Sequence, residues 1–341
     1  MIWQSPYGGI EAPRMSLTER FLAALAEDPG RTVFIDGPSG APMSAGTLMR
    51  RIHAYAGGLE AAGLGAGHVV ALMAPNSPDF AAVFHAILWA GGTATTINPA
   101  CTAPELHRQL VDSGAEALIT VASALDVARG AVEGTKVRAL FSIDGGEGAA
   151  PLAALDGPER MTQAPVDLAR HVAALPFSSG TTGMPKGVML SHANLVVNLD
   201  QSLRVLEIEP GEVTAGVLPF FHIYALTVLM NVFPAGGGTV LTMPRFDLAA
   251  FLQAIETHRM RTLFIVPPIA LALARHPLVD RYDLSSLGYV VSAAAPLAPE
   301  IEAALAARLG CVACQGYGMT ELSPVSHLTP RTAPRRGAAG L

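Results

Sequence analysis

The sequence contains few cysteines, few charged residues and no surplus of basic side chains. Three cysteines in 341 residues cannot form a disulfide framework, which fits a reducing compartment such as the cytoplasm. Only 15% of the residues are charged and the net charge is -6. This balance argues against a nucleic-acid partner, because phosphate backbones are held by a surplus of Lys and Arg. With 50% apolar residues, the chain is expected to be a well-buried globular protein.

The sequence also lacks a recognisable secretory signal and a clear membrane span. The first fifteen residues, MIWQSPYGGIEAPRM, contain no charged region followed by an apolar core. The most apolar segment, residues 217–233, contains Pro219, His222 and Asn231 and is barely long enough to cross a bilayer. We therefore expect a buried helix there, no integral membrane segment and a cytoplasmic location.

Two of the cysteines form the pattern Cys311-Val-Ala-Cys314, which is also the spacing of redox and zinc sites. Neither a second pair nor a set of histidines accompanies them. They lie in an apolar run that ends at Gln315, and residues three apart on a strand point to opposite faces. The pattern favours a buried strand, with a metal or redox site as the alternative.

The most distinctive segment is residues 175–191, LPFSSGTTGMPKGVMLS. A buried strand is predicted up to Phe177, followed by a loop of hydroxyls and glycines and then a return to a strand at residues 187–190. Glycines allow backbone N–H groups to approach an anion closely, and Lys186 supplies a full positive charge. This combination predicts a phosphate-binding loop, with a flexible surface loop as the alternative.

The residue spacing of this segment excludes three other well-known functional loops. A Walker loop requires G-x-x-x-x-G-K-[ST] before a helix, whereas here Pro185 precedes Lys186 and Gly187 follows it. The G-x-G-x-x-G dinucleotide fingerprint is absent. Neither Ser178 nor Ser179 lies in the G-x-S-x-G pattern of an esterase elbow.

The segment SSGTTGMPKG resembles the signature loop of the adenylate-forming (AMP-binding) enzymes, which include acyl-CoA synthetases, 4-coumarate-CoA ligases, luciferases and peptide-synthetase adenylation domains. Three further segments, PFFHIYAL, SAAAPL and QGYGMTE, match the family in its order and are closest to the 4-coumarate-CoA ligase branch. The resemblance implies activation of a carboxylic acid with ATP and Mg²⁺, followed by transfer to coenzyme A.

The resemblance also implies which residues bind the nucleotide. Those assigned to the phosphates are Ser178, Ser179, Gly180, Thr181, Thr182, Gly183 and Lys186. Those assigned to the rest of the nucleotide are Ala294, Ala295, Pro296, Gln315, Gly316, Tyr317, Gly318, Met319 and Thr320.

The residue types in QGYGMTE suit these roles. Tyr317 lies between two glycines and can stack its ring on a purine, although a glycine-rich turn with an incidental tyrosine is the alternative. Glu321 offers the hard carboxylate that Mg²⁺ shares with phosphate oxygens. Thr320 is expected to contact the α-phosphate, so Lys186, Thr320 and Glu321 are assigned catalytic roles.

His222 lies where a strand gives way to a helix, and a lone histidine beside aromatic residues is often a core or capping residue. In related ligases the equivalent histidine borders the acyl carboxylate, so the resemblance implies a catalytic role in stabilising its oxygen. The expected acid-binding residues are His222, Tyr224, Thr227, Val291, Ala293, Ala294, Met319 and Val325.

The residues of this pocket suggest the substrate class. No Asp or Glu is present in residues 219–233 to pair with an ammonium group, which disfavours an amino acid. Plant 4-coumarate-CoA ligases often have a lysine where this chain has Val291, and a glycine where it has Ala293. Both departures make the pocket more apolar. We expect an aryl or medium-chain acid, with cinnamate favoured over its hydroxylated relatives.

Strand and helix patterns alternate along the chain, which predicts an α/β protein with parallel sheets. The family fold is two stacked βα lobes, the N-terminal domain of an acyl-CoA synthetase. We expect the first lobe over residues 1–190, although the N-terminal segment can join the second, and the second lobe over residues 191–330. Residues 331–341 would begin the next part of the family fold.

The family's ribose-binding aspartate, hinge and C-terminal lid domain would follow residue 341. We therefore expect slow or no turnover by this chain alone, and self-association through an edge that the missing part would cover. The alternative function is a nucleotide- and acyl-binding module without turnover.

Overall fold

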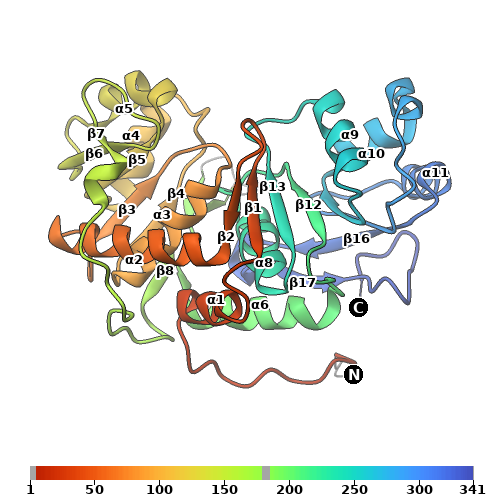
Figure 1. Cartoon of the computed structure of the whole chain (residues 1–341), viewed down its shortest axis with the longest axis horizontal. Coiled ribbons are helices and arrows are strands. Elements are labelled where there is room, and N and C mark those ends of the chain that lie inside the picture. The colour runs from red at the N-terminus through yellow and green to blue at the C-terminus, as the bar shows by residue number, and fades with distance from the viewer. Residues whose placement is uncertain (1–4, 179–184, 341) are drawn as a thin grey trace.

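The computed structural model describes residues 5–178 and 185–340 and contains two halves built on β-sheets (Figure 1). The first half contains a seven-stranded sheet in the order β11-β8-β4-β3-β5-β6-β7, parallel except where β11 meets β8. Its strands are β3 (Val69–Leu72), β4 (Thr93–Thr96), β5 (Ala117–Thr120), β6 (Ala139–Ser142), β7 (Ala150–Pro151), β8 (Val172–Ala174) and β11 (Leu190–Ser191). Its helices are α2 (Ala45–Ala61), α3 (Pro78–Trp89), α4 (Ala103–Ser113) and α5 (Leu125–Val132), with the 3-10 turns η1 (Ala122–Ala124) and η2 (Leu152–Leu155).

The second half contains two four-stranded sheets. The first, in the order β12-β13-β1-β2, consists of β12 (Val213–Gly216), β13 (Thr239–Thr242), β1 (Thr32–Asp36) and β2 (Pro42–Ser44). The other, in the order β14-β15-β16-β17, consists of β14 (Thr262–Ile265), β15 (Tyr289–Ser292), β16 (Val312–Gly318) and β17 (Val325–Leu328). The Thr214 hydroxyl donates to the carbonyl oxygen of Thr262 at 2.7 Å and joins the two sheets.

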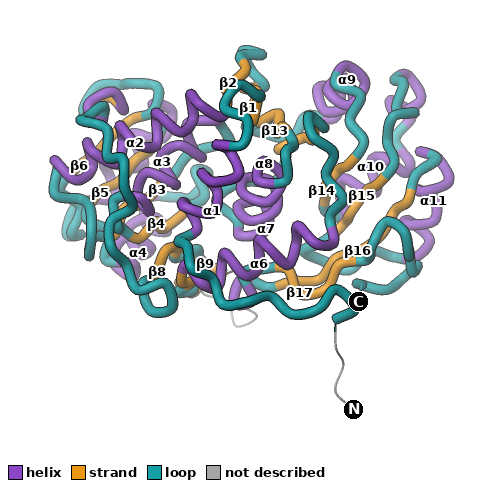
Figure 2. The backbone as a smooth tube through the Cα atoms, turned by 60° about the horizontal axis from the view of Figure 1, so that its bottom comes forward, coloured by secondary structure: helices purple, strands orange, loops and turns teal. Residues whose placement is uncertain are grey.

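The helices of the second half flank and connect these sheets (Figures 1 and 2). They are α1 (Leu17–Ala26), α6 (His192–Val205), α7 (Ile223–Ala225), α8 (Phe233–Ala235), α9 (Leu248–Thr257), α10 (Pro267–Arg275) and α11 (Pro299–Leu309), with the short helical segments η3 (Leu226–Val232), η4 (Pro277–Arg281) and η5 (Thr320–Leu322). A separate hairpin consists of β9 (Phe177–Ser178) and β10 (Lys186–Gly187).

The expected α/β class with parallel sheets is confirmed. Because β1 pairs in parallel with β13, the N-terminal strand belongs to a sheet of the second half. The strands β14, β15 and β16 pair in parallel and in sequence order, so their carboxyl ends meet at one sheet edge. Loops that follow these strands are thereby brought together, although their motifs lie far apart in the sequence.

Local sequence signals account for several helix starts. Ser16 and Glu19 form a reciprocal capping box at the start of α1, and Thr102 and Glu105 form another at α4. The segment after His222 is helical and buried, as expected, whereas residues 217–222 form the turn that precedes the helix. Its middle, η3, is a π-helix in which the Asn231 side chain donates to the Leu226 carbonyl at 2.7 Å. Periodicity alone could not reveal this irregular turn.

Buried histidines support the packing of α1 against its neighbours. His192 accepts a hydrogen bond at Nδ1 from the Leu17 backbone N–H at 3.2 Å, and its ring stacks on His171 at 5.3 Å. Burial lowers the pKa of His192 to about 4. His85 stacks on Phe21 at 4.2 Å, and burial lowers its pKa to about 3. Both rings are therefore neutral near pH 7.

These histidines predict a loss of stability in acid. A histidine with a lowered folded-state pKa binds fewer protons when folded, so the unfolded chain is favoured as pH falls below its unfolded value of about 6.5. For His192 the loss continues to about pH 4. We expect His192 to lower the free energy of unfolding by up to about 1.4 kcal/mol for each unit by which the pH falls in this range. Urea denaturation between pH 7 and 4.5 measures the slope.

The test variant is His192→Asn, and the control variant is His276→Asn. Asparagine retains an acceptor for Leu17 but does not titrate, so the first variant should flatten the pH dependence. His276 is exposed and accepts from the Leu278 N–H at 3.1 Å, so its replacement should leave the slope unchanged. Equal slopes in wild type and His192→Asn would contradict this account.

Candidate active site

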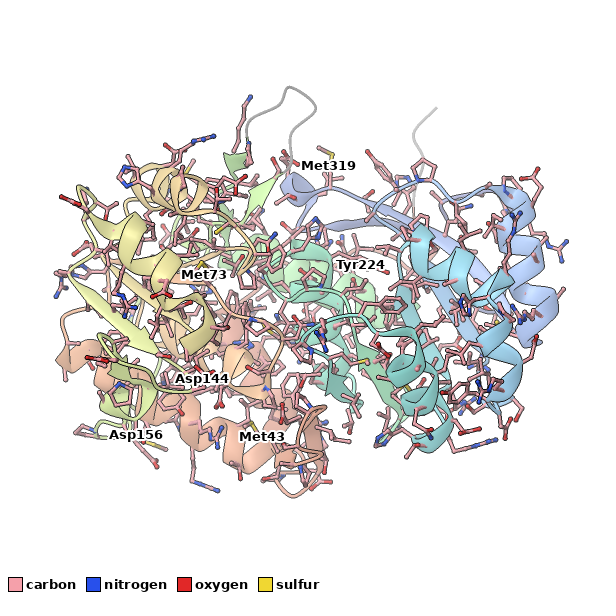
Figure 3. All side chains as sticks on the ribbon, turned by 90° about the horizontal axis from the view of Figure 1, so that it is seen from above. Met43, Met73, Asp144, Asp156, Tyr224 and Met319 are labelled. Atoms are coloured by element: carbon pink, nitrogen blue, oxygen red, sulfur yellow. The ribbon has the colours of Figure 1, made fainter. Side chains whose placement is uncertain are left out.

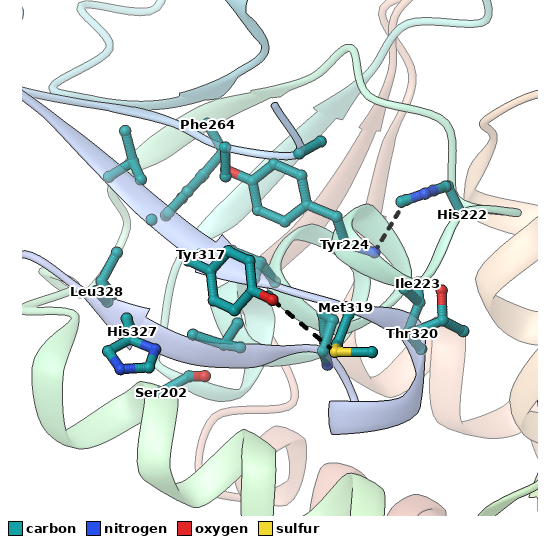
Figure 4. A pocket seen from close by; sticks show the side chains of 18 of the residues that line it. Ser202, His222, Ile223, Tyr224, Phe264, Tyr317, Met319, Thr320, His327 and Leu328 are labelled. Carbon is teal, nitrogen blue, oxygen red and sulfur yellow. Dashed lines mark hydrogen bonds between the residues drawn. The ribbon is translucent and has the colours of Figure 1, made fainter. Parts of the chain in front are cut away.

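A cavity of about 520 Å³ lies between the hairpin β9–β10, the start of α7 and the ends of β15 and β16. Figure 3 shows Tyr224 and Met319, which both line it, near the junction of the two halves. Residues from all four sequence motifs therefore contribute to the same cavity (Figure 4). This is the convergence expected of loops at the carboxyl ends of parallel strands.

One side of the cavity carries the described ends of the phosphate-loop motif. Ser178 and Lys186 face each other as an antiparallel pair in the β9–β10 hairpin, and both line the cavity. Lys186 is exposed, so its ammonium is accessible to an anion. Leu175, just before the hairpin, is bonded to the first sheet: its N–H donates to Ala94 at 2.8 Å and its carbonyl accepts from the Thr95 hydroxyl at 2.8 Å.

The segment leading to His222 is held by a buried amide. Asn76, which follows β3, donates from Nδ2 to the carbonyl oxygens of Gly216 and Leu218 at 2.8 and 2.7 Å. Its Oδ1 accepts from the Phe220 N–H at 2.7 Å. The Thr96 hydroxyl also donates to the Phe221 carbonyl at 2.8 Å. The first sheet thus fixes the backbone that carries His222.

The protonation of His222 follows from its contacts. Its Nδ1 accepts from the Tyr224 N–H at 3.3 Å, so in the neutral ring the proton lies on Nε2. The side chain is accessible because it faces the open cavity, yet the surrounding protein desolvates the ring and lowers its pKa. A neutral imidazole with one N–H donor can stabilise a carboxylate or phosphate oxygen without acting as a permanent cation.

The opposite wall offers flat surfaces suited to a nucleotide base. Gly316, Tyr317 and Gly318 line it from the end of β16, and Tyr317 remains half exposed. A Cβ on Gly318 would lie 2.3 Å from the Pro324 carbonyl oxygen, so only glycine fits. Ala294 adopts φ 72, a left-handed conformation that is strained for alanine and that occurs preferentially at functional sites.

Thr320 and Glu321 line the cavity from the start of η5. Among the described residues, no group of three or more His, Cys, Asp or Glu side chains could hold a metal by itself. A single carboxylate beside a phosphate site nevertheless fits Mg²⁺, which usually takes one or two protein carboxylates and completes its shell with phosphate oxygens and water. Glu321 is the side chain that would contribute.

The inner part of the cavity is more apolar. Tyr224, Val228, Phe264 and Val291 lie there, and Figure 4 shows the Tyr224 ring directed toward Phe264. The Tyr224 hydroxyl is buried and lacks a hydrogen-bond partner within the described ranges. Burial raises its pKa far above the ordinary value, so the group is a neutral donor.

Most of the predicted site residues that the structure describes line this cavity. They are Ser178, Lys186, His222, Tyr224, Val291, Ala293, Ala294, Gly316, Tyr317, Gly318, Met319, Thr320, Glu321 and Val325. The predicted loop residues Ser179, Gly180, Thr181, Thr182 and Gly183 lie outside the described ranges. Their roles, and those of the lining residues, remain predictions.

Four predicted residues do not line the cavity. The Thr227 hydroxyl donates to the Ser323 carbonyl at 3.1 Å. Gln315 is buried, where it accepts from the Leu297 N–H at 2.9 Å and donates to Glu302 at 2.7 Å. Ala295 and Pro296 are exposed beside the cavity.

Sequence reasoning did not identify several residues that shape the site. Phe264 lies near the carboxyl end of β14, where ligands of parallel sheets bind, so its position in an apolar strand pattern could have indicated it. Asn76 follows β3 as a polar residue between apolar segments. No sequence signal marked Ser202, which reaches the cavity from the last turn of α6, or His327 from β17.

The two closely spaced cysteines lie away from this chemistry. Cys314 is within β16 and Cys311 immediately precedes the strand, and both are free thiols. Burial raises the pKa of Cys311 to about 11 and that of Cys314 to about 12. The apolar run that ends at Gln315 forms the strand β16, as expected, with Cys314 buried within it and Cys311 half-buried just before it.

The comparison with family models identifies the class of protein. The model described as AMP-binding enzyme matches residues 21–341. The chain therefore belongs to the AMP-binding enzyme family, as the loop motif predicted.

Its relatives include plant coumarate ligases. The chain is 37% identical over 316 residues to 4-coumarate–CoA ligase 5 of Oryza sativa subsp. japonica, covering 91% of this chain and 58% of that protein. It is 38% identical over 315 residues to 4-coumarate–CoA ligase 3 of Arabidopsis thaliana, covering 89% and 55%. The chain thus spans a little more than half the length of these relatives.

Solved structures share the fold. A long-chain-fatty-acid-CoA ligase from Archaeoglobus fulgidus superposes with a TM-score of 0.89 at 25% identity, covering 99% of this chain and 71% of that one. ATP-bound MatB from Rhodopseudomonas palustris gives a TM-score of 0.85 at 26% identity, covering 96% and 64%. The two-lobe fold predicted from the family resemblance is confirmed.

No helix in the described ranges is both long and apolar enough to cross a membrane.

The Asn76 contacts lead to a stability prediction. Asn76→Ala would leave the buried Leu218 carbonyl and Phe220 N–H without partners. The Gly216 carbonyl would keep the bond from the Met243 N–H. The variant should lower the free energy of unfolding by about 2 to 4 kcal/mol. The control is Asn98→Ala, because Asn98 is exposed and its side chain accepts only from the Ala100 N–H. Chemical denaturation measures both. Equal, small effects would mean that Asn76 does not hold the His222 segment.

Proposed function

We propose that the protein activates a carboxylic acid with ATP. A carboxylate oxygen attacks the α-phosphorus, the bond to the bridging oxygen of the β-phosphate breaks, and pyrophosphate leaves acyl-AMP behind. The sulfur of coenzyme A then attacks the acyl carbon and AMP departs as the thiol loses its proton. The convergence of Lys186, His222, Tyr317 and Glu321 in one cavity is the observation that carries this proposal.

Each of these side chains suits one part of the reaction. Lys186 would neutralise phosphate charge, and Thr320 would donate a hydrogen bond to the α-phosphate. When bound by Glu321, Mg²⁺ would neutralise further charge on the phosphates. The Nε2–H of His222 would stabilise the attacking carboxylate and the oxygens around phosphorus. The Tyr317 ring would stack on adenine, an interaction worth about 1 to 3 kcal/mol per base.

The proposed acid is apolar near its carboxylate and has an aryl or medium-length body. This inference is supported by Val228, Phe264 and Val291, which line the inner cavity without a charge. It also agrees with the names of the relatives, which are 4-coumarate–CoA ligases. Cinnamate is a suitable compact probe, because Val291 offers no charged partner for a ring hydroxyl.

The test is acid-dependent exchange of pyrophosphate into ATP. Cinnamate or octanoate should support exchange with Mg²⁺ that is slow but faster than exchange without acid, and phenylalanine should not. Lys186→Ala should lower the exchange rate by about a hundredfold or more, because the variant lacks the positive charge that would neutralise a phosphate. Lys136→Ala is the matched control, since Lys136 is exposed and does not line the cavity.

The possible outcomes separate two functions. Exchange that requires an acid and Lys186 supports adenylation. Binding of ATP without exchange for any acid supports the alternative, a nucleotide- and acyl-binding module without turnover. Exchange that is equally fast in Lys186→Ala would contradict the role given to the phosphate loop.

A further inference from the structure

A second cavity, of about 360 Å³, adjoins the first and shares part of its wall. It lies between α6, the end of β17 and the segment that precedes α1, which runs beside α6 in both ribbon views (Figures 1 and 2). Its lining residues are Ser5, Tyr7, Gly8, Ile10, Asn198, Gln201, Ser202, Arg204, Val205, Leu322, Val325, Ser326 and Leu328.

Three residues line both cavities and therefore form the wall between them. They are Ser202 of α6 and Val325 and Leu328 of β17. Ser202 has only two side-chain heavy atoms, so the wall is thinnest at this position. A longer side chain here would fill the junction.

The Ser202 hydroxyl is an unusual feature of this wall. The residue is 2% exposed, and its Oγ has no hydrogen-bond partner among the residues that the structure describes. Leaving such a buried group unpaired is unfavourable, because it has lost its hydrogen bonds to water without replacing them. A polar atom of a ligand that lies across the wall could complete this hydrogen bond.

The framework around the junction is well fixed. The Asn198 side chain donates to the Val325 carbonyl at 2.7 Å and accepts from the Val325 N–H at 3.2 Å, which joins α6 to β17. Arg204 donates to the carbonyl oxygens of Tyr7 and Gly9 at 2.8 and 3.2 Å, which joins α6 to the N-terminal segment. The second cavity is therefore bounded by elements tied to one another.

The chemistry of the second cavity differs from that of the first cavity's inner end. Phe264, Val228 and Val291 give the first cavity apolar surface, whereas Gln201, Ser326 and the Ser202 hydroxyl give the second cavity hydrogen-bonding groups. A purely hydrocarbon tail would displace water from these groups without replacing its hydrogen bonds. A tail that ends in a hydroxyl group could replace them.

We propose that the acid-binding site extends past Ser202 into this second cavity and accepts medium to long carboxylic acids whose far end carries a hydrogen-bonding group. The inference rests on the proposed function, because it takes the first cavity as the site of the acyl-adenylate. It adds the length of the acid and the polarity of its far end.

The test measures binding of acyl-adenylate analogues in which a sulfamate replaces the phosphate, so that turnover is not required. Cinnamoyl, dodecanoyl and ω-hydroxydodecanoyl sulfamoyl adenosines serve as compact, long apolar and long polar-ended probes. Isothermal titration calorimetry on the full chain gives each dissociation constant. The ω-hydroxydodecanoyl probe should bind more tightly than the dodecanoyl probe.

The variant Ser202→Leu should close the junction. The ratio of the ω-hydroxydodecanoyl to the cinnamoyl dissociation constant is expected to rise by about tenfold or more, which is the size of effect a few methylene groups have in a pocket. Ser202→Ala removes the hydroxyl but adds no volume, and should raise the ratio much less. Cinnamoyl binding by each variant verifies that the site is folded.

Each failure has a distinct meaning. If no probe binds wild type, the proposed function fails together with its site. If the cinnamoyl probe binds but the long probes do not, or if Ser202→Leu leaves the ratio unchanged, the extension is wrong and the proposed function stands. If both long probes respond to Ser202→Leu but bind equally well, the proposed polar far end is wrong.

Discussion

The parallel pairing of β14, β15 and β16 is the constraint on which the site depends. It aligns Ile265, Ser292 and Gln315 in one register, so the chain leaves all three strands at the same edge. Segments separated by many residues then have to share the space beyond that edge. The active-site motifs can be short because the sheet supplies their relative positions, and each motif only has to supply chemistry.

The first sheet contributes through a few buried hydrogen bonds rather than through its own loops alone. Asn76 and Thr96 hold the backbone before His222, and Thr95 holds Leu175 before the phosphate-loop hairpin. The catalytic candidates thus lie on segments tied to two sheets at once. Such support matters because positioning and charge neutralisation account for most of the rate in phosphoryl and adenylyl transfer.

Much of this arrangement could be predicted from sequence. Alternating strands and helices indicated parallel sheets, and the family resemblance assigned Lys186, His222 and Tyr317 to one site. The patterns Ser16-x-x-Glu19 and Thr102-x-x-Glu105 also mark the starts of α1 and α4. The π-helix at residues 226–232 could not be foreseen, because the spacing of its apolar residues does not distinguish a π-helix from an α-helix. Nothing in the sequence indicated Ser202 either. Its proposed importance comes from its position in the wall between two cavities, which only the structure shows. Gln315 is polar and near the motif, yet its side chain is occupied by Leu297 and Glu302.

The most direct test of the central claim uses the chain's only two lysines, Lys136 and Lys186, which are both exposed. An amine-reactive reagent, read out by peptide mass spectrometry, measures the modification rate of each with and without ATP and Mg²⁺. If Lys186 contacts the phosphates, nucleotide at about ten times its dissociation constant should slow labelling of Lys186 about tenfold. Labelling of Lys136 should not change. Equal labelling of Lys186 with and without bound nucleotide would contradict the phosphate site.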